Sequence, residues 1–370
     1  MAYRVIIIED MPELMEDMVM TLRKSPDFEV SSTYKTAGSA IGPSAMFDPN
    51  LFLISIDNEE TLNTLSTFVD IFPGAYILGT MAQWDSLKAK RALEAGAAGC
   101  ILKPFAAKEI IDYLRLYSMR GKHKPAKVIS FFSPKGRSGR TTLAALLALL
   151  IAEKTGERVA LIDADLQFGD LPIFFDLDPK RTIVDATQDI KLLTPMSFSA
   201  YFMELKKGVS LLSSPDRPEY AELVSPENLV EVVMMTENIF RYVLIDLPAG
   251  FNPLSLSLCR NSDVIFVTSM INSGFEIKHV RKTLEMFEAQ EEDRRKVKTV
   301  FTRVNPFNEE ERQKLSISLG YPVDVIIPNE YRMISIANSG RLSHGLPADT
   351  LLMKTISKMA EKVIDKEGGR

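Results

Sequence analysis

The sequence predicts an α/β protein made of two doubly wound domains, each with a parallel sheet covered by helices on both faces. Apolar runs of strand length alternate with helical patterns from the first residues onward, which is typical of parallel strands joined by helices. At 370 residues the chain is too long for one ordinary core. A stretch rich in Gly, Pro and Lys interrupts the alternation, so we expect an N-terminal domain at 1–117, a linker at 118–126 and a C-terminal domain at 127–370.

The composition is typical of a soluble globular protein and limits the possible functions. Hydrophobic residues make up 46% of the chain and charged residues 25%, and the net charge of -5 argues against a general nucleic-acid coat. The longest apolar run, 143–152, has about half the length of a membrane span. The N-terminus lacks a signal-peptide pattern, and Cys100 and Cys259 are the only cysteines. We therefore expect a cytoplasmic protein without disulfides.

Polar residues stand at the expected strand ends of the N-terminal domain, at Glu9, Asp10, Thr80 and Lys103. In these positions the domain resembles the flavodoxin-like receiver domain of response regulators. The resemblance implies a phosphate-accepting aspartate where this chain has Ser55, with Asp57 beyond the end of the strand. Because serine cannot form an acyl phosphate, we expect a receiver-shaped docking module without phosphorelay activity.

A Gly-rich turn opens the C-terminal domain, in "SPKGRSGRTT" at 133–142, between the apolar strand "AKVISFF" and an apolar helix. Strand, turn and helix in this order let backbone N–H groups converge on phosphate. Against the phosphate-loop pattern G-x-x-x-x-G-K-[ST], Gly139 and Thr141 match, whereas Pro134 and Arg140 do not. The loop by itself is therefore a weak signal.

Two more apolar strands end in aspartates and strengthen the signal. Asp163 and Asp165 end "RVALIDAD", and their side chains face the same way because they stand two residues apart. Asp246 ends "RYVLID" and precedes the turn "LPAG". We expect Thr141, Asp163 and Asp246 to hold a metal ion, and Asp165 to orient water if the protein hydrolyses nucleotide.

These motifs together resemble the deviant Walker A ATPases of the MinD and ParA superfamily, from residue 127 to about 365. The resemblance implies ATP and Mg²⁺ as cofactors and an ATP sandwich between two copies of the chain, with Lys135 reaching the partner's nucleotide. It places Asn305, at the end of "FTRVN", and Pro328 near the adenine. The remaining cofactor-binding residues that it implies are Gly136, Arg137, Ser138, Gly139, Arg140, Thr141 and Thr142.

Arginine at position 140 decides the expected mechanism. A guanidinium is wider than an ammonium, planar and always charged, so we expect Arg140 to hold phosphate. We expect it to fit a compact transition state poorly, where small misplacements cost about 100-fold in rate. The sequence therefore predicts ATP binding with slow or absent hydrolysis.

The pairing of the two domains resembles TadZ/CpaE-type pilus assembly proteins. That resemblance implies a scaffold that positions a pilus or secretion machine at a cell pole, with other assembly proteins as partners and only peripheral membrane contact through them. The main alternative is a ParA-like partition ATPase that binds DNA nonspecifically through "RRKVK" at 294–298, although a solvated connection explains this run more simply.

Three further interpretations concern the C-terminal domain. An iron–sulfur enzyme on this fold would need paired cysteines, which the sequence lacks. The last helix, "LLMKTISKMAEKVIDK", could bind a membrane as in MinD, but packing on the sheet is favoured. For "LPIFF" at 171–175 we favour core packing over a partner surface.

Overall fold

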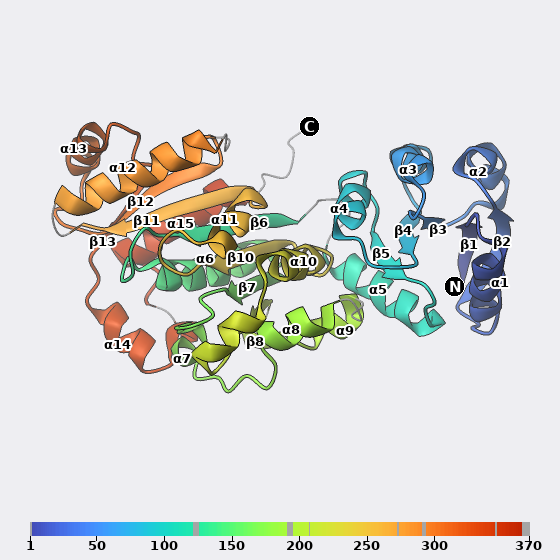
Figure 1. The fold of residues 1–370 in the computed structure, drawn as a ribbon, viewed down its shortest axis with the longest axis horizontal. Helices are drawn as coiled ribbons and strands as arrows, with labels where there is room; N and C mark the ends of the chain where they lie inside the picture. The colour runs from blue at the N-terminus through green and yellow to red at the C-terminus, as the bar shows by residue number, and fades with distance from the viewer. Residues whose placement is uncertain are drawn as a thin grey trace. The chain divides into compact units, whose positions relative to one another are not determined.

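The computed structural model describes residues 2–120, 126–190, 195–206, 208–271, 274–290, 294–344 and 346–364. The chain divides into two compact units (Figure 1). The first comprises Met1–Pro125 with two short segments, Asp189–Ala200 and Met234–Ile239, and the second comprises the rest. Of the expected linker, residues 118–120 end a helix and 121–125 lie outside the described residues, so the domain boundaries stay a prediction.

The first unit contains a parallel sheet of five strands in the order β2-β1-β3-β4-β5, which is the flavodoxin-like order. Each strand pairs in parallel with its neighbours, and one register shift lies between Val5 and Ile6. The strands are β1 Tyr3–Ile8, β2 Phe28–Tyr34, β3 Leu51–Ser55, β4 Tyr76–Met81 and β5 Gly99–Leu102.

Helices cover both faces of this sheet, because successive strand side chains point to opposite sides. Ile6 and Ile8 of β1 pack into a core shared with α2, α3 and α4, whereas Val5 and Ile7 pack with α1 and α5. The helices are α1 Pro12–Arg23, α2 Ala37–Ser44, α3 Glu59–Ile71, α4 Ser86–Glu94 and α5 Ala107–Arg120, with the short 3-10 helix η1 Ala45–Phe47 after α2.

The second unit contains an eight-stranded sheet in the order β13-β12-β11-β6-β10-β7-β9-β8. The pairs are parallel, except for the antiparallel pair of β8 and β9 at one edge. The strands are β6 Lys127–Phe132, β7 Val159–Asp163, β8 Met203–Lys206, β9 Val209–Leu212, β10 Tyr242–Asp246, β11 Val264–Met270, β12 Val297–Val304 and β13 Val325–Pro328.

Two neighbouring residues of β6 show that this sheet is also covered on both sides. Phe131 belongs to the core that includes α6 and α15, whereas the ring of Phe132 lies 5.5 Å from that of Phe287 on α12. The α/β parallel-sheet class is thus confirmed. From residue 126 onward the helices are α6 Arg140–Thr155, α7 Leu171–Phe174, α8 Ile183–Asp189, α9 Pro195–Ser199, α10 Pro226–Glu237, α11 Pro253–Arg260, α12 Gly274–Ala289, α13 Glu309–Leu319, α14 Arg332–Asn338 and α15 Leu351–Val363, with 3-10 helices η3 Pro218–Leu223 and η4 Leu342–His344.

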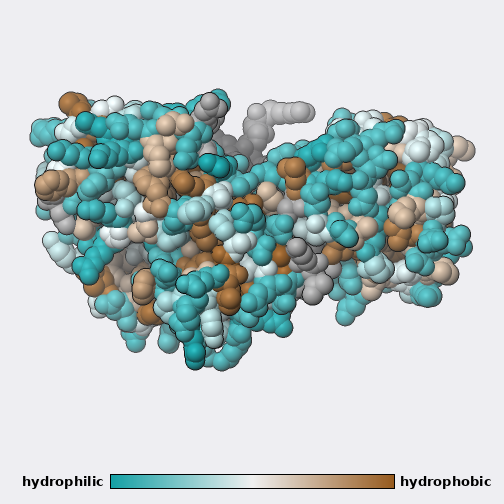
Figure 2. Space-filling model, in the orientation of Figure 1, coloured by the Kyte–Doolittle hydropathy of each residue, from teal (hydrophilic) through white to brown (hydrophobic). Residues whose placement is uncertain are grey.

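The last described helix, α15, packs in the core of the second unit. Its apolar stripe is buried, at Leu352, Ile356, Met359 and Val363, within the cluster that contains α6. The expected packing of this helix on the sheet is therefore confirmed. Among the described helices, none combines the length and the apolar character needed to cross a bilayer. The face seen in Figure 2 is mostly hydrophilic, with hydrophobic residues interspersed.

Candidate nucleotide-binding site

The Gly-rich loop is held in place by the strands on either side of it. The Ser138 carbonyl accepts a hydrogen bond from the Thr302 hydroxyl at 2.7 Å, and the Ser138 hydroxyl lies 3.2 Å from that of Thr268. At the other end, the Gly250 N–H donates to the Ser133 carbonyl at 2.8 Å. The loop therefore joins β6 to α6 in a fixed shape, and the first N–H groups of a 16-residue helix lie at its end.

Two loop residues adopt left-handed backbone conformations. Gly139 precedes α6 with φ 80°, where glycine has no steric penalty. Arg137 has φ 63°, which costs an L-residue about 1–2 kcal/mol. The side chains of Lys135 and Arg137 are exposed, as expected for cations that meet a ligand or a second chain.

Arg140 is held between two carboxylates at the start of α6: Nε donates to Asp246 Oδ1 at 2.9 Å and Nη2 donates to Asp165 Oδ2 at 2.7 Å. The sequence did not predict these two contacts, and the expected contact of the guanidinium with phosphate stays a prediction. Only 8% of the Arg140 side chain is exposed. The reason is electrostatic, since two acids at adjacent strand ends attract the one buried cation between them.

The expected metal ligands are brought together, but their oxygens are engaged. Thr141 Oγ1 donates to Asp246 Oδ2 at 2.6 Å, so that both Asp246 oxygens have protein donors. Asp163 is fully buried and also faces protein donors: its Oδ2 accepts from the Leu171 N–H at 3.2 Å and the Ser214 hydroxyl at 3.3 Å. Its Oδ1 accepts from a backbone N–H at 3.3 Å.

The side-chain oxygens of Thr141, Asp163 and Asp246 are therefore not arranged as a ready Mg²⁺ site. Hard divalent cations need several free oxygens at short distance, and here Arg140 and Thr141 occupy those of Asp246. Across the described ranges, no group of three His, Cys, Asp or Glu residues is arranged to hold a metal ion. Asp163 anchors the segment that follows β7, and the expected metal-binding roles of Thr141, Asp163 and Asp246 stay a prediction.

Burial raises the pKa of several carboxyl groups around Arg140. Burial raises the pKa of Asp246 to about 6, and the nearby Arg140 guanidinium and Thr141 hydroxyl limit the increase. Burial, followed by the neighbouring Asp246 carboxylate, raises the pKa of Asp163 well above its ordinary value. Burial and the Asp165 carboxylate also raise the pKa of Asp170. One guanidinium therefore balances a crowded group of acids.

The segment after β7 divides between core and surface. Leu171 and Phe175 are buried, as expected for "LPIFF", whereas Ile173 is 61% exposed and Phe168 is 74% exposed. Gly169 packs so closely on the acids that a Cβ there would lie 2.5 Å from Asp163 Oδ2. Glycine is therefore required for this segment to lie on the carboxylate.

A cleft of about 530 Å³ opens beside the start of α6. Thr142 and Pro328, both expected to contact nucleotide, line it, whereas Asn305 is exposed and is not among its lining residues. Sequence reasoning missed the apolar and aromatic residues that complete the walls, although the quoted stretch "IPNEYRMISIAN" contains several; they include Leu146, Phe174, Ile327, Tyr331, Met333 and Ile356.

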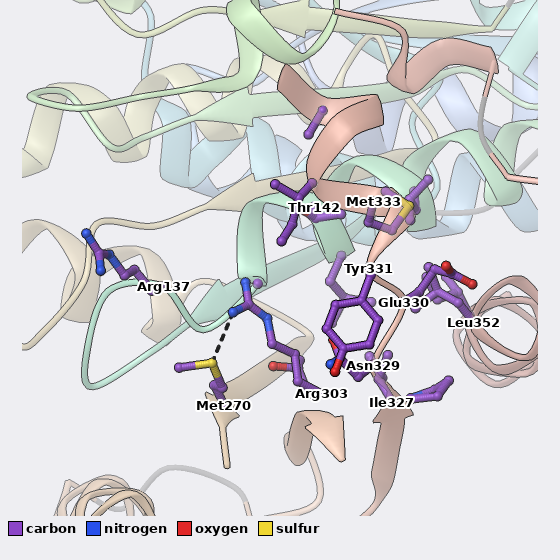
Figure 3. Close-up of a pocket in the computed structure, with 18 of the residues that line it drawn as sticks. Arg137, Thr142, Met270, Arg303, Ile327, Asn329, Glu330, Tyr331, Met333 and Leu352 are labelled. Carbon is purple, nitrogen blue, oxygen red and sulfur yellow. Dashed lines mark hydrogen bonds between the residues drawn. The ribbon is translucent and has the colours of Figure 1, made fainter. Parts of the chain in front are cut away.

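The mouth of the cleft carries two exposed arginines. The Arg303 guanidinium donates to the sulfur of Met270 at 3.2 Å (Figure 3). Arg137 lies well apart from Tyr331 in this view, and Tyr331 is 76% exposed. The cleft thus combines an apolar bed with cations at its edge, which suits a ligand with a flat apolar part and anionic groups.

The first unit has its own polar cluster at the ends of its strands. The buried Lys103 ammonium contacts the Glu9 carboxylate, the Ser55 hydroxyl at 3.1 Å and Asp57 Oδ2 at 2.9 Å. Asp57, which we expected beyond the strand's end, therefore reaches the cluster. The Asp57 carboxylate also accepts from the Ala82 N–H at 3.0 Å.

A phosphate-type loop between strand and helix, with acids at the ends of β7 and β10, defines an α/β nucleotide-binding protein of the P-loop class. Residues 129–342 match the family model "CobQ/CobB/MinD/ParA nucleotide binding domain". The chain belongs to this family.

Individual relatives agree with the family over the second unit. The septum site-determining protein MinD of Thermotoga maritima is 25% identical over 245 residues, which are 64% of this chain and 87% of that protein. A ParA family ATPase from Chlorobium tepidum superposes with a TM-score of 0.58 and 18% identity, covering 64% of this chain and 98% of that one. MinD from Pyrococcus horikoshii, solved with Mg-ADP, gives 0.54 and 19%, covering 64% and 96%.

The raised pKa of Asp163 predicts a pH-dependent effect of Asp163→Asn. The acid of the folded protein is protonated more readily than that of the unfolded chain, so its contribution favours folding at low pH and is lost as pH rises through the folded pKa. Asp163→Asn removes the ionisable group, so this loss of folding stability at high pH does not occur in the variant. Asparagine has one acceptor oxygen and loses part of the hydrogen bonding of Asp163 at every pH, so the prediction concerns the pH dependence: the melting temperature of the variant minus that of the wild type should rise by a few degrees from pH 4 to pH 8. Calorimetry tests this, with the exposed Asp178→Asn as control; a difference that falls from pH 4 to pH 8 would contradict the assignment.

Proposed function

We propose that this chain binds ATP in the cleft beside α6. The cleft carries this proposal, because it joins an apolar bed to the N-terminus of a long helix. Ile327 and Met333 offer apolar surface for a base, and Pro328, the last residue of β13, lines the cleft with them. The N–H groups of the first turn of α6 and the Thr142 hydroxyl suit the phosphates. Lys135, Gly136, Arg137, Ser138, Gly139 and Thr141 complete the proposed binding loop.

Thr142→Ala should weaken ATP binding about tenfold or more, because a hydrogen bond to a charged group contributes roughly 1.5–3 kcal/mol. Thr155→Ala, at the other end of α6, is the matched control, since its hydroxyl bonds the Ile151 carbonyl. Equilibrium titration with a fluorescent ATP analogue measures both. Equal affinity for the two variants would place the phosphates elsewhere.

We further propose that ATP joins two copies of the chain, with slow hydrolysis. Lys135 stands exposed on the loop, where its ammonium can reach a facing subunit's phosphates. Asp165, the proposed water-orienting residue, is ion-paired to Arg140, and its Oδ1 accepts from the Phe168 N–H at 3.3 Å. A carboxylate held in this way has little freedom to activate water, which supports weak turnover.

Lys135→Ala should keep ATP binding by the single chain within a few-fold and lose ATP-dependent dimers, because its charge acts on the other subunit. Lys154→Ala, whose ammonium pairs with Glu361 on the surface, is the control. Light scattering with and without ATP reports the dimer. Dimers of Lys135→Ala as abundant as those of the wild type would leave a nucleotide-independent scaffold as the better description.

The cellular role that we propose is positioning of a pilus or secretion machine at a cell pole, by a protein of TadZ/CpaE type. Several relatives are named septum site-determining proteins, which supports a positioning role. The first unit, with its flavodoxin-like strand order, would serve as a receiver-type docking module toward pilus or secretion partners. Contact with the inner membrane would then be peripheral, through these partners.

Acetyl phosphate should leave the mass of the intact protein unchanged, because Ser55 stands where an acceptor carboxylate would and Asp57 is paired with Lys103. Mass spectrometry of the wild type and of Asp57→Asn tests this. An added phosphate that is present in the wild type and missing in Asp57→Asn would identify Asp57 as an acceptor and the unit as a working switch.

A partition ATPase that binds DNA through 294–298 finds less support. Arg294 Nε lies 3.6 Å from Glu288 Oε1, and Lys298 Nζ lies 3.9 Å from Asp324 Oδ1. The Lys296 ammonium donates to the Arg260 carbonyl at 3.2 Å. These cations are largely engaged by the protein itself, which leaves a weak electrostatic footprint for DNA.

A further inference from the structure

The guanidinium of Arg140 lies among the acids at the ends of β7 and β10. It pairs with Asp246 at 2.9 Å and with Asp165 at 2.7 Å, and both Asp246 oxygens are engaged once the Thr141 hydroxyl is included. A divalent cation placed among these oxygens would have to displace Arg140 and Thr141 from them. The structure therefore supplies positive charge to this group of acids from within the chain.

Arg140 keeps hydrogen-bonding capacity beyond these two acids. A guanidinium has five N–H donors, and the two bonds to Asp246 and Asp165 leave three. In the described chain, Nη1 has no hydrogen-bond partner and is not among the fully buried unsatisfied atoms. Free donors on a cation already fixed by carboxylates suit an anion such as phosphate, with which guanidinium forms strong paired bonds.

The position of Arg140 in its helix supports the same conclusion. It is the first residue of α6, where the helix dipole is positive and a cation is unfavourable. Asp246 and Asp165 offset this cost on one side. A phosphate group at the helix N-terminus would offset it on the other, so both the dipole and the guanidinium would attract the same ligand.

We propose that Arg140 takes the place of the divalent cation, so that this site binds nucleoside triphosphate without Mg²⁺. The inference rests on the proposed ATP binding and adds how its phosphate charge is balanced. The guanidinium donates its remaining N–H groups to a phosphate oxygen while it stays paired with Asp246 and Asp165, and it cannot dissociate because it belongs to the chain. A lysine here has one charged atom and cannot pair with both acids in the same way.

The test compares binding of a fluorescent ATP analogue in Mg²⁺ and in EDTA. For the wild type, the dissociation constants should differ by less than about threefold. For Arg140→Lys, binding in EDTA should be at least about tenfold weaker than in Mg²⁺, because one carboxylate loses its partner and repels phosphate unless a metal joins them. The exposed Arg260→Lys should behave as the wild type.

The outcomes separate this inference from the proposed function. Wild-type binding that weakens tenfold or more in EDTA overturns the role of Arg140 and leaves ATP binding intact, whereas absence of binding in both buffers overturns ATP binding itself. If Arg140→Lys fails to fold, the wild-type comparison still decides.

Asp165→Asn provides a second variant. It removes one carboxylate that competes with phosphate for Arg140, so binding in EDTA should become several-fold tighter. An unchanged or weaker affinity in EDTA would contradict the proposal.

Discussion

The ion pairs of Arg140 with Asp246 and Asp165 connect three parts of the second unit that are far apart in sequence. Arg140 begins α6, Asp246 ends β10, and Asp165 follows β7. These elements meet because β10 lies between β6 and β7 in a parallel sheet, whose strand ends share one edge. Breaking a buried pair of this kind by removing one partner costs about 3–5 kcal/mol. The loop, the acids and the following segments therefore depend on one another.

Asp163 extends this network toward the surface. Its two oxygens accept hydrogen bonds from the Leu171 N–H, the Asp165 N–H and the Ser214 hydroxyl, which fixes the segment after β7. The same segment exposes Phe168, whose N–H donates to Asp165. The acids therefore hold in place a segment that carries an exposed apolar side chain.

The first unit balances its acids by the same principle. A buried lysine, Lys103, contacts Glu9 and Asp57, and the Ser55 hydroxyl completes its surroundings. In both units an acidic strand edge thus has an internal cation. The second unit differs in the cleft beside its acids, which is lined by Thr142 and Met333.

The sequence by itself determined the alternation of strands and helices, the phosphate-type loop and the three aspartates, because apolar periodicity and residue order are local properties. Two residues that it indicated as nucleotide-binding, Thr142 and Pro328, line the cleft. Only the tertiary structure decided that Arg140 faces carboxylates, since that depends on which strand ends are neighbours. It likewise placed Asn305 outside the cleft lining, because a side chain's direction at a strand end depends on the packing around it.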